Sequence, residues 1–121
     1  GRGGVRMNIT LPWPPSALNP NARHAHWSVK SKAAKAYRAA CKALAEAHGV
    51  VAPDSPKIAL WVEFVPPDRR QRDDDNMVAS FKAGRDGLAD ALGVDDRRFV
   101  CRHTVADEVG GMVRVSITPE V

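Results

Sequence analysis

Short apolar runs with a period of two are the feature that most constrains the fold of this chain. Met7, Ile9 and Leu11 alternate with polar residues, and similar runs follow at 58–65, 99–105 and 112–118. Such alternation is typical of half-buried β-strands. The four runs therefore predict four strands, and Gly110-Gly111 predicts a hairpin between the last two.

Two other segments have helical spacing of their apolar residues. Ser31 can cap a helix that continues to Gly49, a residue suited to a helix C-terminus. A second helical pattern follows Asn76 and ends at Gly93. The order strand, helix, strand, helix, strand, strand predicts an α+β fold, in which two main helices pack on one mixed sheet of about four strands.

The length of 121 residues is that of one domain, which we place at residues 7–121. The segment 1–6 before Met7 is interpreted as an extension outside the fold. Cys41 and Cys101 have no Cys or His at ligand spacing, so we expect reduced packing residues. No apolar run approaches the ~20 residues of a membrane span and no signal-peptide pattern opens the chain, so we expect a cytoplasmic protein.

The charge balance favours an anionic partner. Eighteen Lys and Arg residues against 14 Asp and Glu give a net charge of +4, and the sequence pI is about 9.4. Nucleic acid and acidic membrane surfaces are the usual partners of such proteins. The basic residues of the first helix fit either a solvated face or a stripe that faces phosphates.

The run from Arg69 to Asn76 contains three arginines and three consecutive aspartates. Adjacent carboxylates repel one another, and a bound cation relieves that repulsion. In an extended segment Asp73 and Asp75 would point into one site while Asp74 faces elsewhere, and Asn76 would cap the next helix. Mg²⁺ commonly shares one or two carboxylates with phosphate oxygens. The plain alternative is a solvated helix N-terminus, where acidic residues complement the helix dipole.

A second acidic pair, Asp95-Asp96, lies between the second helix and the third strand. If that helix folds back along the sheet, the pair can return to the first aspartate cluster. Taken alone, two aspartates in this position are a turn signal more often than a ligand site.

Three segments together resemble the RusA-type Holliday-junction resolvases: ITLPWPPS at 9–16, RRQRDDDN at 69–76 and GVDD at 93–96. The similarity spans nearly the whole chain after Met7. It implies a Mg²⁺-dependent endonuclease, with Mn²⁺ as a possible substitute, that acts as a homodimer. Its substrate would be a four-way DNA junction, resolved by paired nicks in DNA recombination and repair. By motif match, Asp73, Asp75 and Asp96 would be the metal-binding catalytic carboxylates.

The family also uses a lysine on the helix that follows the Asp-Asn element. Ala79 occupies the usual place here, and Lys82 matches if three residues have been added. Three residues turn a helix by ~300° and advance it by ~4.5 Å, so Lys82 can point to the same side as Ala79. The alternative is a surface pair between Lys82 and Asp86 at i,i+4.

The remaining candidates are basic residues that would contact phosphates. The first group is Arg69, Arg70 and Arg72, and the second is Arg23, His24 and Lys30. Each of them also fits an ordinary surface residue. Trp13, between prolines, fits a packing anchor better than a base-stacking group.

Two further functions stay open on the residues alone. One is a non-catalytic basic DNA-binding module whose acidic loop caps a helix. The other is a metal-dependent nuclease that acts on other branched nucleic acids, such as flaps or RNA.

Overall fold

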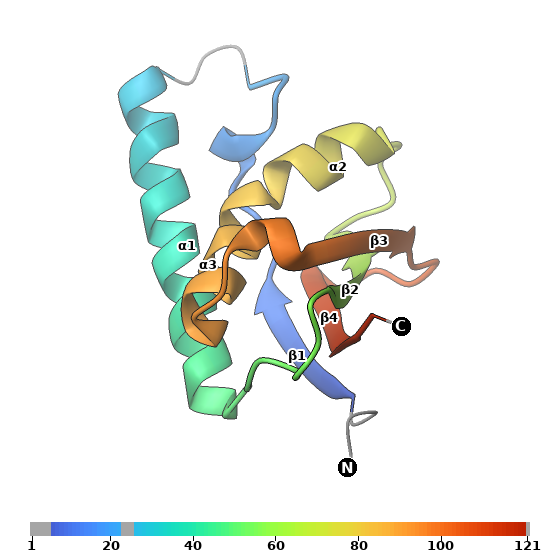
Figure 1. Cartoon of the computed structure of the whole chain (residues 1–121). Coiled ribbons are helices and arrows are strands. Elements are labelled where there is room, and N and C mark those ends of the chain that lie inside the picture. Colours follow the sequence, from blue (N-terminus) through green and yellow to red (C-terminus); the bar gives the residue numbers. More distant parts are fainter. Residues whose placement is uncertain (1–5, 23–25, 121) are drawn as a thin grey trace.

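Four strands form one mixed sheet in the computed structural model, which describes residues 6–22 and 26–120. The strands are β1 (Met7–Pro12), β2 (Ile58–Val65), β3 (Phe99–Val105) and β4 (Met112–Pro119), in the order β1-β4-β2-β3 (Figure 1). β4 runs antiparallel to both of its neighbours, whereas β2 and β3 are parallel. The α+β fold with a mixed sheet is therefore confirmed.

Three α-helices pack on one face of this sheet, where the sequence predicts two (Figure 1). They are α1 (Trp27–His48), α2 (Asp74–Ser80) and α3 (Lys82–Leu92), and two short 3-10 helices occupy Ser16–Leu18 (η1) and Asp96–Arg98 (η2). The break between α2 and α3 falls at Phe81, whose ψ of −3° departs from helical geometry. None of the helices within residues 6–22 and 26–120 is both long and apolar enough to span a membrane.

The first helix begins earlier than its sequence predicts. His26, not Ser31, precedes the first turn, and its ring nitrogen Nδ1 lies 3.4 Å from the backbone N of Ser28. No Pro or Gly interrupts residues 27–30, so the helix extends through them. The predicted end is confirmed, because Gly49 adopts a left-handed φ of 77°.

The predicted hairpin between β3 and β4 is wrong, because β2 lies between them. The backbone N–H of Gly110 donates to the carbonyl of Pro66 (2.8 Å) and that of Gly111 donates to Val65 (2.9 Å). The connection after β3 is therefore tied to the end of β2 and crosses over it. The burial of nearly every β2 residue is typical of a central strand, and the exposure of most β3 residues is typical of an edge strand.

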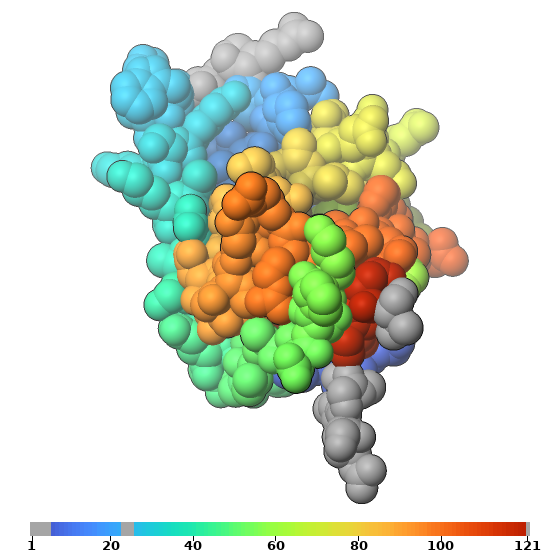
Figure 2. Space-filling view, viewed as in Figure 1, coloured from blue at the N-terminus to red at the C-terminus, as the bar shows by residue number. Residues whose placement is uncertain are grey.

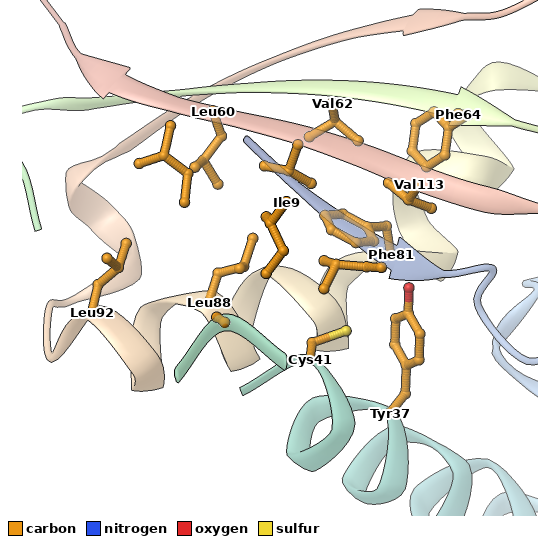
Figure 3. Packing of buried hydrophobic residues seen from close by; sticks show 14 of the residues in the cluster. Ile9, Tyr37, Cys41, Leu60, Val62, Phe64, Phe81, Leu88, Leu92 and Val113 are labelled. Carbon is orange, nitrogen blue, oxygen red and sulfur yellow. The ribbon is translucent and has the colours of Figure 1, made fainter. Parts of the chain in front are cut away.

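The hydrophobic core lies between the sheet and the helices. Figure 3 shows Phe81, Leu88 and Cys41 pointing from the helices toward Leu60 and Val62 of β2. The largest fully buried side chains are Phe64, Leu11, Ile58, Leu60, Leu88, Ile117, Val65, Val113, Val115 and Cys41. Burial of each large aliphatic or aromatic side chain of this kind contributes about 1.5–3 kcal/mol to folding.

Two close contacts position the segments that surround the acidic cluster. Gly87 packs against α1 so tightly that a Cβ there would overlap the carbonyl oxygen of Arg38. The hydroxyl of Tyr37 donates to the carbonyl oxygen of Pro12 at 2.6 Å, and burial raises the pKa of Tyr37. Together these contacts fix α3 and the chain after β1 against α1.

Candidate functional site

The acidic cluster forms the beginning of α2. Asp73 is the N-cap residue, and its Oδ1 accepts a hydrogen bond of 2.8 Å from the backbone N–H of Asp75. The prediction of an extended segment with Asn76 as the cap is therefore wrong: the helix already begins at Asp74, and Asn76 lies within it. Asp74 and Asp75 occupy the first turn, where negative charge complements the helix dipole.

Asp73 faces a polar groove of about 350 Å³, which we call the Asp73 groove. Asp73 and Asn76 line it from α2, Arg70 lines it from the preceding loop, and Trp13 and Ser16 line it from the segment after β1. Two of the three segments that carry the family resemblance thus meet in space, although they are far apart in the chain.

Arg72 is held within the loop and is not presented to solvent. Its side chain is only 17% exposed, and its Nη1 donates to the carboxylate of Asp68 at 2.8 Å. This hydrogen bond holds the pKa of Asp68 below its usual range. The guanidinium also lies 5.6 Å from the ring centroid of Trp13, which itself packs edge-on against Phe64. Trp13 is therefore confirmed as a packing anchor. Arg72 was predicted to contact phosphates, but part of its guanidinium is already bonded to Asp68, so fewer of its N–H groups can reach DNA.

The other predicted phosphate contacts differ in their exposure. Arg69 is exposed, and Arg70 is 82% exposed, 3.7 Å from the nearest Asp68 oxygen. Both side chains can therefore reach an anion from solvent. Lys30 lies in the first turn of α1 and is half-buried. Arg23 and His24 lie outside the described residues.

A second groove, of about 210 Å³, runs between α2–α3 and the edge strand β3, and we call it the β3 groove. Ala79, Lys82 and Arg85 line it from the helices, and Cys101 and His103 line it from β3. In the space-filling view the yellow atoms of α2 and the orange atoms of α3 and the start of β3 lie side by side (Figure 2). Burial raises the pKa of the Cys101 thiol.

Lys82 and Ala79 line the same groove, as predicted, although the helix breaks at Phe81 between them. The Nζ of Lys82 also lies 3.8 Å from Oδ2 of Asp86, which is the surface pair expected as the alternative. Since the Lys82 side chain is 69% exposed, this pair contributes little to stability and leaves the ammonium free to turn toward a ligand.

Arg85 and His103 are functional candidates that the sequence interpretation missed. Nη2 of Arg85 lies 3.4 Å from Oδ2 of Asp96, and Nε2 of His103 lies 3.4 Å from Oδ2 of Asp74. The Nε of Arg85 is buried and has no hydrogen-bond partner among residues 6–22 and 26–120. Arg85 could have been identified from the sequence, because it follows Lys82 by three residues and so lies on the same helix face.

The structure does not bring Asp96 to the other aspartates within one chain. Asp96 immediately precedes β3, whereas Asp74 contacts His103 near the end of β3. His103 lies four residues after Phe99, which is roughly 13 Å of strand, so Asp96 and Asp74 approach the β3 groove at different points along β3. Within residues 6–22 and 26–120, no three His, Cys, Asp or Glu side chains are grouped to hold one metal ion. The predicted convergence fails because α2 and α3 carry the chain back to the start of β3.

These features define a single-domain α+β protein with an acidic helix terminus between two partly basic grooves. No family model matches the chain. A protein of Xylella fastidiosa (strain Temecula1 / ATCC 700964), described as "Uncharacterized protein", is 47% identical to it over 122 residues. The alignment covers 95% of this chain and 79% of the Xylella protein. The chain therefore belongs to the same family as that protein.

Proposed function

We propose that the chain is a Mg²⁺-dependent endonuclease that resolves four-way DNA junctions. The observation that carries this proposal is the exposed aspartate cluster 73–75, beside Arg69 and Arg70 and at the rim of the Asp73 groove. Carboxylates next to exposed cations fit a site that binds a metal ion and a phosphate together. The resemblance of 9–16, 69–76 and 93–96 to RusA-type resolvases supports the same activity and supplies the junction as substrate.

The aspartates fit a site for a hard divalent cation. Asp73 uses Oδ1 to cap α2, which leaves its Oδ2 for a cation, and the exposed carboxylate of Asp75 lies within the same turn. Mg²⁺ binds through one or two carboxylates together with waters and phosphate oxygens, and Mn²⁺ accepts the same donors. Such an ion, when bound, makes water more nucleophilic and offsets the charge that develops on the phosphate.

The chain's own cations would position the DNA. Arg69 and Arg70 are exposed beside Asp73 and would contact phosphates on either side of the cut. Lys82, from the β3 groove, would add positive charge next to the phosphate. Such contacts are independent of base sequence, so binding weakens steeply as salt rises.

A homodimer would supply the third carboxylate. β3 forms an edge of the described sheet; Asp96 lies just before its start, and Asp74 contacts His103 in its second half. A two-fold axis near the middle of β3 would place Asp96 of a second copy beside the aspartates at the start of α2. Each of the two sites would then contain residues of both copies, which suits a substrate that is cut at two opposed positions.

Substituting Asp75→Asn tests the nuclease directly. We expect junction binding to persist and Mg²⁺-dependent cleavage to be lost, because one oxygen ligand loses its charge while the helix is kept. Asp54→Asn is the matched control, since it removes one exposed carboxylate from the loop before β2 and is expected to cut normally. Cleavage by the Asp75 variant at the wild-type rate contradicts the assignment.

Mixing two inactive variants tests the shared site. If Asp75 and Asp96 come from different copies, a dimer of one Asp75→Asn chain and one Asp96→Asn chain contains one intact site and one doubly substituted site. After free exchange of an equal mixture about half of the dimers are of this kind, so about a quarter of all sites are active. If both residues act within one copy, every site keeps a substitution and the mixture stays inactive.

A non-catalytic DNA-binding module is the second candidate, and the capping geometry favours it. Asp73 caps α2, and Asp74 and Asp75 complement its dipole, so their positions are accounted for without a metal. This module predicts junction binding by the wild-type protein without Mg²⁺-dependent cleavage. A nuclease for other branched nucleic acids predicts instead that flaps or RNA are cut in preference to the junction.

A further inference from the structure

Three basic residues of the β3 groove are loosely held by aspartates. Lys82, Arg85 and His103 each have one aspartate neighbour, at 3.8, 3.4 and 3.4 Å. Two ion pairs outside the groove, Arg38–Asp90 and Arg72–Asp68, join their atoms at 2.7 and 2.8 Å. Charge-assisted hydrogen bonds are strongest near the shorter distance, so Lys82 and Arg85 can exchange their partners more readily than Arg38 and Arg72 can.

Arg85 has donor capacity that the free protein does not use. A guanidinium presents five N–H donors in a planar fork that matches two phosphate oxygens. In the part of the chain that the structure describes, Arg85 contacts Asp96 through Nη2 at 3.4 Å, and its buried Nε has no partner. A modest rotation of the side chain would offer both groups to one anion in the groove. A buried donor beside a groove is satisfied by water or by a ligand with oxygen acceptors, and a phosphate supplies such acceptors.

Arg102 also lines the groove but is committed elsewhere. Its guanidinium donates to both carboxylate oxygens of Glu120, at 2.8 and 3.2 Å, and stacks over Trp61 at 5.0 Å. The available donors are therefore those of Arg85 and His103, with Lys82 at the rim. Their spacing along one groove suits consecutive oxygens of an extended anion.

We propose that the β3 groove binds a phosphate of a nucleic-acid strand, with Arg85 and His103 as its donors and Asp96 and Asp74 as the partners that this phosphate replaces. The choice of nucleic acid as the ligand rests on the proposed function. The aspartates offset the positive charge of the groove. A divalent cation that takes up the Asp96 carboxylate in the proposed shared site releases Arg85, so metal and DNA strengthen each other's binding by the same factor.

Substitution of Asp96 and of its neighbour Asp95 tests whether a phosphate replaces the aspartate partner of Arg85. In metal-free buffer with chelator, we expect Asp96→Asn to bind a fluorescent four-way junction several-fold more tightly by anisotropy, because Arg85 loses its competing carboxylate. Asp95→Asn removes the same charge one residue away, where the side chain faces Arg97 and not the groove. Equal changes in affinity for the two variants overturn the proposal.

Two arginine substitutions test the phosphate contact itself. Arg85→Gln and Arg114→Gln each remove one positive charge, but Arg114 pairs with Glu63 and Glu108, away from the groove. A lost phosphate contact lowers the slope of log affinity against log salt by about 1. We expect that loss for Arg85→Gln alone, and identical slopes for the two variants contradict the assignment.

The side-chain Nε–H resonance of Arg85 in wild-type protein provides a readout that does not depend on a variant's folding. We expect it to shift on addition of a short oligonucleotide and to stay in place with inorganic phosphate at the same phosphate concentration. No shift with either ligand, or a shift with inorganic phosphate only, overturns the proposal.

These readouts separate the two proposals, because none of them uses cleavage. If the wild-type protein does not cut the junction but its Arg85 resonance shifts with the oligonucleotide, the proposed nuclease activity is wrong and the proposed phosphate site in the β3 groove is supported. Normal cleavage and binding by Arg85→Gln refutes the groove and keeps the nuclease.

Discussion

Replacing Asp73 with asparagine and with alanine separates the capping of α2 from the proposed binding of a metal ion. The Oδ1 of Asp73 accepts the N–H of Asp75 at 2.8 Å. Asparagine caps helices about as well as aspartate, so Asp73→Asn should change the free energy of unfolding by less than about 0.5 kcal/mol. Alanine has no acceptor, and Asp73→Ala should cost about 1 kcal/mol. For a chain of this length that lowers the Tm by about 3–5 °C.

Cleavage should respond differently from stability. Both variants lose the negative charge, so both should lose Mg²⁺-dependent cutting of a four-way junction, although only the alanine variant loses stability. Thermal unfolding by circular dichroism and a gel assay of junction cleavage, run on the same samples, measure the two effects. Wild-type cutting by Asp73→Asn refutes the metal role. A fall in Tm for asparagine as large as that for alanine refutes the capping argument.

Three further predictions test the fold around the site. Gly87→Ala should lower the unfolding free energy by about 1–3 kcal/mol in urea, because the added Cβ overlaps the α1 backbone, and an unchanged midpoint contradicts that packing. Tyr37→Phe should cost about 1–2 kcal/mol, because it leaves a carbonyl oxygen of β1 without its 2.6 Å hydrogen bond, and no loss by the same assay argues against it. A thiol reagent at pH 8 should modify Cys101 and not Cys41, because Cys41 is fully buried and burial raises its pKa to about 11. Mass spectrometry of the folded protein detects the modified cysteines, and modification of both would be inconsistent with this core.

Local patterns predicted the strands and the helix ends well. Period-two alternation located all four strands to within a residue or two, and Gly49 and Gly93 end α1 and α3 in the left-handed conformation. These features are fixed by residues close in sequence, so one segment at a time is enough to recognise them.

Strand order depends on contacts that no single segment contains. Gly110-Gly111 fits a hairpin turn, but its N–H groups bond to the end of β2, and β4 pairs with β2. The burial of β2 on both faces, set against the polar residues Arg102 to Thr104 of β3, was the signal for an inserted strand. Alternation within each strand could not show it.

The candidate site was predicted only in part, because it too depends on contacts between separate segments of the chain. The sequence located the aspartates 73–75 and placed Lys82 and Ala79 on one side, but it did not predict that Asp96 contacts Arg85. Arg85 and His103 come from different elements, so only the packing of α3 against β3 reveals that they line one groove.

Cleavage of a synthetic mobile four-way junction tests the central claim most directly. The wild-type protein is incubated with the junction, a linear duplex and a flap, each with Mg²⁺ and with chelator. The proposed function predicts paired nicks in the junction that require Mg²⁺, with the duplex and flap cut far more slowly. An intact junction under Mg²⁺, bound but uncut, would contradict it.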